Sequence, residues 1–129
     1  MRLHTLPGGK TAARYPAGVY HWRAIVQQAV AGCEHEPFVG PVEVRLGFDL
    51  TRPQGHFGTG KNSTRLKPSA PIWPGVMPDI DKLSRAVLDS ITDAGLWKDD
   101  AQVVVLYAAK RYALERAPGV LITIIELTA

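Results

Sequence analysis

Three runs of β-prone residues constrain the fold of this chain more than any other feature of its sequence. The segment PVEVRLGFDL (residues 41–50) alternates apolar and polar side chains, which predicts a strand with one buried face and one wet face. The runs AQVVVLYAAKRY (101–112) and GVLITIIEL (119–127) are rich in β-branched residues, and the short connection between them predicts a hairpin. The last run is apolar on both faces, so we expect it at the centre of a sheet covered by helix.

Helical periodicity precedes the first of these strands. Apolar residues recur at helical spacing from Val19 to Val30, Pro16 suits a first turn, and Gly32 stands where a C-terminal cap belongs. Residues 1–15 show no clear period, and we expect them to be irregular.

A second helix is predicted between the first two β-prone runs. It begins near Asp79, its buried stripe extends from Leu83 to Ala94, and Gly95 is placed as the residue that follows its end. Together these elements predict an α+β fold in which a small mixed β-sheet packs with two main helices.

Composition excludes several classes of protein. The 129 residues suit one domain, and the hydrophobic fraction of 46% and charged fraction of 21% are those of an ordinary globular protein. No apolar run approaches the roughly 18 residues needed to cross a bilayer. The N-terminus lacks the apolar core of a secretory signal, and Cys33 is the only cysteine. We therefore expect one cytoplasmic domain with Cys33 as an inert buried thiol.

A long connection, residues 52–77, separates the first strand from the second helix, and we call it the arm. The arm is rich in Gly, Pro, Ser and Thr and contains no acidic residue. Loops of this length are generally functional or disordered. We expect a mobile arm that contacts DNA phosphates, although a tolerant surface loop is the alternative. The candidate DNA-binding residues are Arg52, His56, Lys61, Asn62, Arg65 and Lys67.

Acidic residues gather in the stretch that follows the arm. Residues 78–102 contain six of the twelve acids of the chain, and all six are aspartates. This stretch has three basic residues and a local charge of −3, whereas the rest of the chain has twelve basic and six acidic residues, a charge of +6. An acidic cluster surrounded by basic segments suits a site at which basic residues attract a polyanion and acidic residues hold the cations that act on it. Two independent solvated surfaces would show the same pattern.

Four of the six aspartates form two pairs, one at each end of the second helix. If Asp79 is an extended N-cap and Asp81 lies in the first turn, both carboxylates can converge near the helix N-terminus. Capping alone would explain them. Asp99 and Asp100, however, directly precede a strand, and a strand that runs back could bring them beside the helix start. Several carboxylates so close together repel one another unless a cation neutralises them, and hard oxygen ligands select Mg²⁺ or Mn²⁺.

The stretch MPDIDKLSRAVLDSITDAGLWKDDAQV (77–103) resembles the RusA family of Holliday-junction resolvases, which has D-x-D-x-L opening a helix and D-D-x-Q before a strand. Element order extends a looser resemblance over residues 41–127, and the arm is similar to the basic loop before the motif in phage and actinobacterial members. The N-terminal part matches poorly.

The resemblance implies a homodimeric endonuclease, dependent on Mg²⁺ with Mn²⁺ as a substitute, that makes paired nicks across a four-way DNA junction. It also implies that the chain is encoded by a bacterium or a phage. Asp79, Asp81 and Asp100 correspond to its metal-binding catalytic carboxylates, with Asp99 as a neighbouring group. The family also has a catalytic lysine four residues after the second aspartate. Here that position is Arg85, which cannot donate a proton, so either Lys82 replaces the lysine or the mechanism differs. An ion pair between Arg85 and Asp81 is the structural alternative.

Two other functions fit the same sequence. The chain could be a branched-DNA-binding module without nuclease activity, its acids serving as caps. It could also be a metal-dependent phosphohydrolase that acts on nucleotides, in which case the arm would not affect activity.

Overall fold

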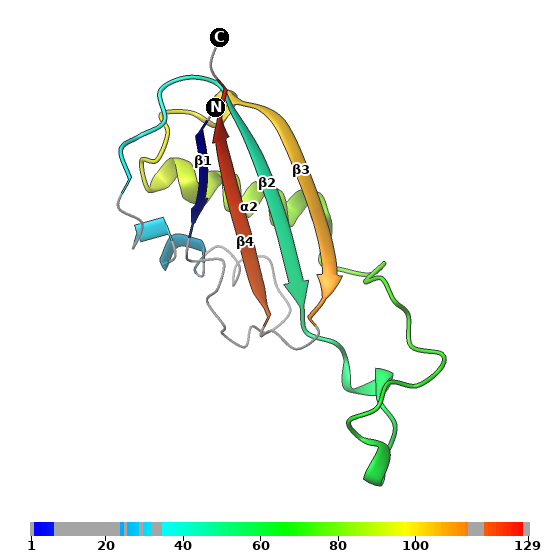
Figure 1. Cartoon of the computed structure of the whole chain (residues 1–129). Coiled ribbons are helices and arrows are strands. Elements are labelled where there is room, and N and C mark those ends of the chain that lie inside the picture. Colours follow the sequence, from blue (N-terminus) through cyan, green and yellow to red (C-terminus); the bar gives the residue numbers. More distant parts are fainter. Residues whose placement is uncertain are drawn as a thin grey trace.

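The computed structural model describes residues 2–6, 24, 26–28, 30–31, 35–113 and 118–127. Within these residues a four-stranded mixed sheet packs against a helix, α2 (Ile80–Asp93), as Figure 1 shows. The predicted α+β class with a mixed sheet is confirmed. The strands, in the sheet order β1-β4-β2-β3, are β1 (Arg2–Leu6), β4 (Gly119–Glu126), β2 (Val42–Leu50) and β3 (Val103–Tyr112).

The alternating pattern of β2 produces the predicted two-faced strand. Its five alternate apolar side chains are buried against the core, and Arg45 and Glu43 on the other face form an ion pair with a nitrogen–oxygen distance of 2.7 Å. The prediction for β4 is also confirmed, because β4 lies between β1 and β2, and Ile122 and Ile124 are fully buried.

The predicted hairpin between β3 and β4 is wrong. β2 lies between them, pairing antiparallel with β4 and parallel with β3. A parallel pair needs a long crossover connection, and the arm together with α2 supplies it between β2 and β3. The β-branched runs indicated that strands exist here, but residue composition does not specify which strands pair.

The N-terminal residues also differ from the prediction. Residues 2–6, expected to be irregular, form β1, which pairs antiparallel with β4 from Arg2 opposite Glu126 to Leu6 opposite Ile122. The five residues of β1 are too few to show a period, and the partner strand supplies the hydrogen bonds that stabilise them.

The helical periodicity before β2 agrees with the residues that the structure describes there. Residues 24, 26–28, 30 and 31 are helical, and Val26 and Val30 are buried in the same core as α2. The remainder of that predicted helix and Cys33 lie outside the described residues.

α2 packs its apolar stripe on the sheet and ends as predicted. Leu83, Val87 and Ile91 are fully buried. Gly95 has a φ of +77°, and its N–H donates to the carbonyl of Thr92 at 3.0 Å. This is the left-handed residue of a Schellman ending.

The predicted buried stripe of α2 is one residue too long. Ala94, expected on the buried face, is the exposed C-cap. The chain leaves the helical path there, so the helical period no longer decides which side faces the core. No helix in the described part of the chain is long and apolar enough to cross a membrane.

Candidate functional site

The first aspartate pair lies at the start of α2, as predicted. Asp79 is the N-cap, with extended dihedral angles of φ −71° and ψ 139°, and Asp81 is in the first turn. The side chain of Asp79 makes no capping hydrogen bond. Capping therefore does not account for this carboxylate, although the position would allow it.

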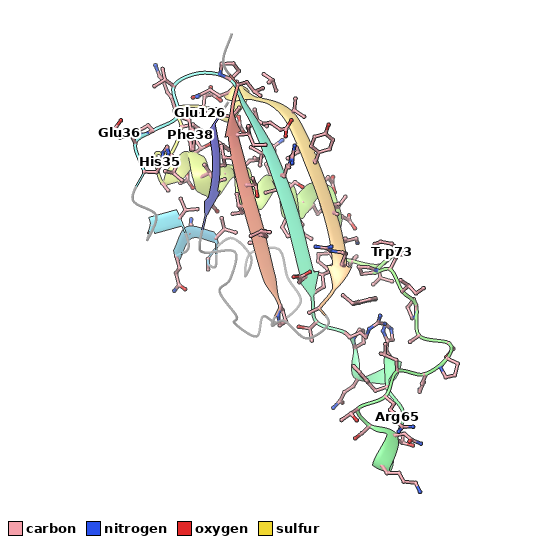
Figure 2. All side chains as sticks on the ribbon, viewed as in Figure 1. His35, Glu36, Phe38, Arg65, Trp73 and Glu126 are labelled. Atoms are coloured by element: carbon pink, nitrogen blue, oxygen red, sulfur yellow. The ribbon has the colours of Figure 1, made fainter. Side chains whose placement is uncertain are left out.

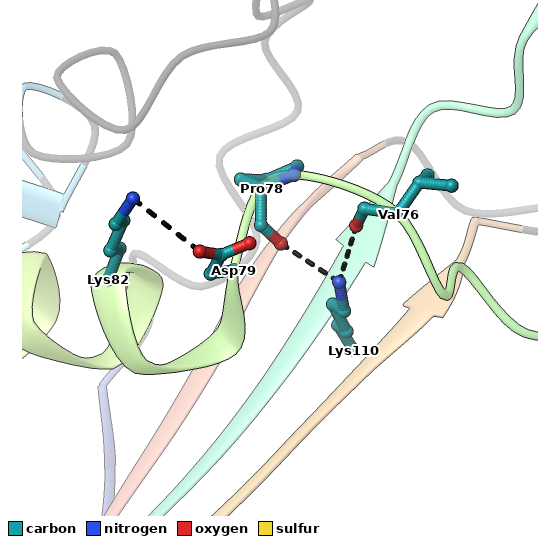
Figure 3. A network of polar contacts seen from close by, with 5 residues as sticks. All are labelled: Val76, Pro78, Asp79, Lys82 and Lys110. Atoms are coloured by element: carbon teal, nitrogen blue, oxygen red, sulfur yellow. Dashed lines mark hydrogen bonds and ion pairs between the residues drawn. The ribbon is translucent and has the colours of Figure 1, made fainter.

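The carboxylate of Asp79 turns instead toward a lysine on the helix surface. Its oxygen lies 3.5 Å from the ammonium of Lys82, and Figure 3 shows the two side chains facing each other. Both are more than half exposed, so the pair contributes little to stability. Among the described residues, no ion pair joins Arg85 to Asp81, so the structural explanation of Arg85 is not supported.

A lysine from β3 anchors the chain just before this helix. The Lys110 ammonium donates to the carbonyl of Val76 at 2.6 Å and to that of Pro78 at 2.9 Å (Figure 3). The alternation of β3 carries a signal for this role, because Lys110 shares the face of the strand that Leu106, Ala108 and Tyr112 otherwise keep apolar.

The second aspartate pair divides into a capping residue and a free one. Asp99 is the N-cap of the short helix η4 (Asp100–Gln102), and its Oδ1 accepts from the N–H of Ala101 at 2.9 Å. In return, Gln102 Oε1 accepts from the N–H of Asp99 at 3.3 Å. This is a capping box, and the D-D-x-Q spacing is a signal for it that the sequence reading missed. Asp100 is half-buried, and its side chain has no hydrogen bond or ion pair in the described residues.

Gln102 also joins η4 to the segment before β2. Its Nε2 donates to the carbonyl of Phe38 at 2.9 Å and to that of Gly40 at 3.0 Å. Trp97 is buried beside this junction, and its indole donates to the hydroxyl of Thr92 at 2.7 Å. Trp97 therefore closes the end of α2.

The two aspartate pairs do not meet within one chain. Asp100 immediately precedes the first residues of β3, whereas the start of α2 is held by Lys110 near the last residues of that strand. Residues 103 to 110 of an extended strand span about 23 Å at roughly 3.3 Å per residue. Among the described residues, no group of three or more His, Cys, Asp or Glu side chains could hold a metal ion. The expected convergence of the two pairs inside one chain is wrong. β3 does run back toward the start of α2, but Asp99 and Asp100 precede the strand and therefore lie at its other end.

Arg52, the first of the predicted DNA-binding residues, holds the base of the arm in place. Arg52 donates to the carbonyl of Pro71 at 2.7 Å, lies 3.2 Å from His56 Nδ1, and sits over the Tyr112 ring at 4.3 Å from its centroid. His56 meets the same ring edge-on at 5.4 Å. Arg52 and His56 thus connect the arm to the end of β3, a role the sequence reading did not assign to them.

The tip of the arm presents the other candidate residues to solvent. The backbone N–H of Gly58 donates to the carbonyl of Arg65 at 2.9 Å, and Phe57 pairs with Leu66 in an antiparallel bridge. The tip extends away from the sheet, with Arg65 near its end in Figure 2. The exposed candidates on it are Lys61, Asn62, Arg65 and Lys67.

The last part of the arm, just before α2, exposes apolar side chains. Ile72, Trp73, Val76 and Met77 are all more than 60% exposed, and Figure 2 shows Trp73 on this stretch. The sequence reading singled out none of these residues. Exposed apolar groups of this size generally mark contact surfaces.

Comparison with known proteins identifies the group to which the chain belongs. The sequence matches the family described as endodeoxyribonuclease RusA over residues 6–125. Because the match covers nearly the whole chain, the protein belongs to the RusA endodeoxyribonuclease family, and the match includes the N-terminal part that resembled the family poorly. The chain is also 27% identical over 128 residues to an uncharacterized protein of Bacillus subtilis (strain 168), YqaN, a match that covers 97% of this chain and 86% of the relative.

Proposed function

We propose that this protein is a Mg²⁺-dependent endodeoxyribonuclease that resolves four-way DNA junctions by paired nicks, in recombination, repair or phage DNA processing. One observation supports this proposal beyond family membership. Asp79 stands at a helix start without capping it, and Asp100 lies half-buried without a partner in the described residues, whereas their neighbour Asp99 is fully used as a cap. Carboxylates that perform no structural task are available to a ligand.

The proposed metal ligands are Asp79, Asp81 and Asp100, and one chain does not bring them together. Carboxylate oxygens are the donors that Mg²⁺ prefers, so the residue types fit the ion. Since the described residues of one chain offer no group of three, the missing carboxylate must come from elsewhere. A second copy of the chain is the simplest source.

The edge of the sheet offers a surface on which a second copy can bind. β3 is an edge strand of ten residues, and it contains no proline and no charged residue before Lys110. Val104 and Tyr107 are each 59% exposed and Leu106 is 42% exposed. Natural edge strands usually carry charges, prolines or covering segments, so an apolar and unblocked edge suits pairing with another chain.

Antiparallel pairing of two β3 strands would unite the separated aspartates. In a two-fold arrangement the first residues of one strand lie beside the last residues of the other. A register centred near Leu106 sets Gln102 opposite Lys110 of the partner subunit. Asp100 would then approach the α2 start of the second copy, where Asp79 and Asp81 lie. Two such sites, related by a two-fold axis, suit a junction that must be cut on two opposed strands.

Within each site the side chains of this protein have separate tasks. When bound, Mg²⁺ would neutralise the carboxylates and activate water for attack on the scissile phosphate. Lys82 and Arg85, both exposed on the first turns of α2, would hold the phosphate by charge. The basic tip of the arm would hold neighbouring phosphates, and junction recognition would depend on phosphate positions and DNA shape.

Cleavage of a labelled four-way junction tests the proposal. We expect symmetric nicks that need Mg²⁺ and that vanish in Asp81→Asn and in Asp100→Asn while junction binding persists. Tight binding without cutting under any divalent ion would indicate a binding module instead. Nucleotide hydrolysis that is indifferent to the arm would indicate a phosphohydrolase.

A mixture of the two inactive variants tests whether the site is shared. A dimer with one Asp81→Asn chain and one Asp100→Asn chain would have one doubly altered site and one intact site. Mixing after partial unfolding and refolding should therefore restore single nicks. If each site were built within one chain, the mixture would stay inactive.

A further inference from the structure

Lys110 places a positive charge where a helix ordinarily attracts negative charge. Its side chain belongs to the face of β3 that packs toward α2, since Lys110 is in register with Phe48, which is fully buried. Lys110 is half-buried, and its ammonium donates to the carbonyls of Val76 and Pro78. These two residues flank Met77 in the sequence just before the helix. The N-terminus of a helix carries a partial positive charge, so a cation there is unfavourable unless acids lie nearby.

In sequence, the acids nearest to this anchored backbone are the two proposed metal ligands at the start of α2. Asp79 directly follows Pro78, and Asp81 is two residues further along. Lys110 therefore fixes the main chain that leads into Asp79 (Figure 3). Lys82, by contrast, is 64% exposed and contacts only the tip of Asp79, so it cannot fix the backbone.

We propose that Lys110 is a positioning residue of the metal site, which keeps Asp79 and Asp81 arranged for the ion by holding the backbone at Val76 and Pro78. This inference rests on the proposed function, because it assumes that the two aspartates bind the metal. Groups that orient metal ligands contribute to affinity, although they do not touch the ion.

Metal binding by Lys110→Met tests the inference, because methionine is of similar length and has no donor. The titration uses Mn²⁺ with the DNA-free protein, followed by electron paramagnetic resonance, and junction cleavage is then measured over a series of Mg²⁺ concentrations. We expect the Mn²⁺ dissociation constant and the Mg²⁺ midpoint of cleavage to rise by about 10-fold or more, as the loss of outer-shell partners generally produces. Junction binding without metal should persist, because the basic residues at the tip of the arm are unaltered.

Arg111→Met is the matched control. Arg111 is the next residue on the same strand, but it faces away from α2 and lies 3.9 Å from Asp49. Its removal takes the same charge from the same end of β3 and should leave metal affinity as in the wild type. Lys110→Arg, which can still donate to both carbonyls, should restore most of the affinity.

The outcomes separate the two proposals. Wild-type protein that neither binds Mn²⁺ nor cuts the junction would overturn the proposed function itself. Wild-type activity together with unchanged metal affinity in Lys110→Met would overturn only the role of Lys110, as would a loss of the same size in Arg111→Met. If Lys110→Met does not fold, Lys110→Gln takes its place under the same criteria.

Discussion

Asp99 and Gln102 together cap the start of η4: the Asp99 carboxylate accepts from the N–H of Ala101, and the side-chain oxygen of Gln102 accepts from the N–H of Asp99. Adjacent aspartates therefore have different roles. Asp99 is committed to the backbone, and Asp100 remains free for a ligand within the described residues.

Substitution of each aspartate separately should distinguish these roles. Asp99→Ala removes a cap and should lower the free energy of unfolding by about 1 kcal/mol, with part of the cleavage activity retained. Asp100→Ala should change stability by less than about 0.5 kcal/mol. It should nevertheless lower cleavage strongly, because Asp100 is a proposed metal ligand. Loss of a group that only orients a ligand generally costs roughly 10–100-fold, and the loss here should be larger. Urea unfolding and junction cleavage under saturating Mg²⁺ measure the two effects, and equal effects of both substitutions would contradict the assignment.

The structure of the arm depends on one glycine. A Cβ at Gly58 would lie 2.8 Å from the carbonyl oxygen of Asn62, whereas a Cβ at Gly55 would meet nothing within 4 Å. We expect Gly58→Ala to force a shift of the arm that costs about 1–3 kcal/mol. If binding the junction requires the original arm conformation, this cost weakens binding, and each loss of about 1.4 kcal/mol weakens it tenfold. Gly55→Ala is the control. Fluorescence anisotropy with a junction measures affinity, and identical binding by both variants would show that the arm's fold does not matter.

The charge of the arm tip should determine the salt dependence of junction binding. Neutralising Lys61, Arg65 and Lys67 to glutamine should weaken binding and reduce the slope of log affinity against log salt by about 0.9 for each DNA phosphate that the variant no longer neutralises. Arg45→Gln removes a charge from the sheet face, where it is already paired with Glu43. That control should leave the slope unchanged. An unaltered slope in the triple variant would exclude the arm from phosphate binding.

The sequence predicted local structure well and long-range relationships poorly. Three local features were predicted correctly: the alternation in β2, the buried stripe of α2 and the helix ending at Gly95. They depend on the spacing of apolar residues along the chain and on backbone sterics. Strand order did not follow, because any β-branched run can pair with any other. For the same reason, the two aspartate pairs were expected to meet, although a ten-residue strand separates them. The capping role of Asp99 was readable from its spacing to Gln102, but the anchoring role of Lys110 needed the partner strand to be known.

The exposed edge of β3 gives the most direct test of the shared site. Leu106→Lys adds a charge to an edge that would be buried between two copies, and charged residues on edges prevent strand pairing. We expect this variant to be monomeric in sedimentation velocity and inactive on junctions, while a thermal unfolding transition shows that the domain remains folded. Leu121→Lys is the matched control, because Leu121 is similarly exposed at 40% but lies on β4, away from the edge. Its sedimentation and cleavage should equal those of the wild type. A Leu106→Lys variant that cuts junctions as a monomer would contradict the shared site and would mean that all three carboxylates act within one chain.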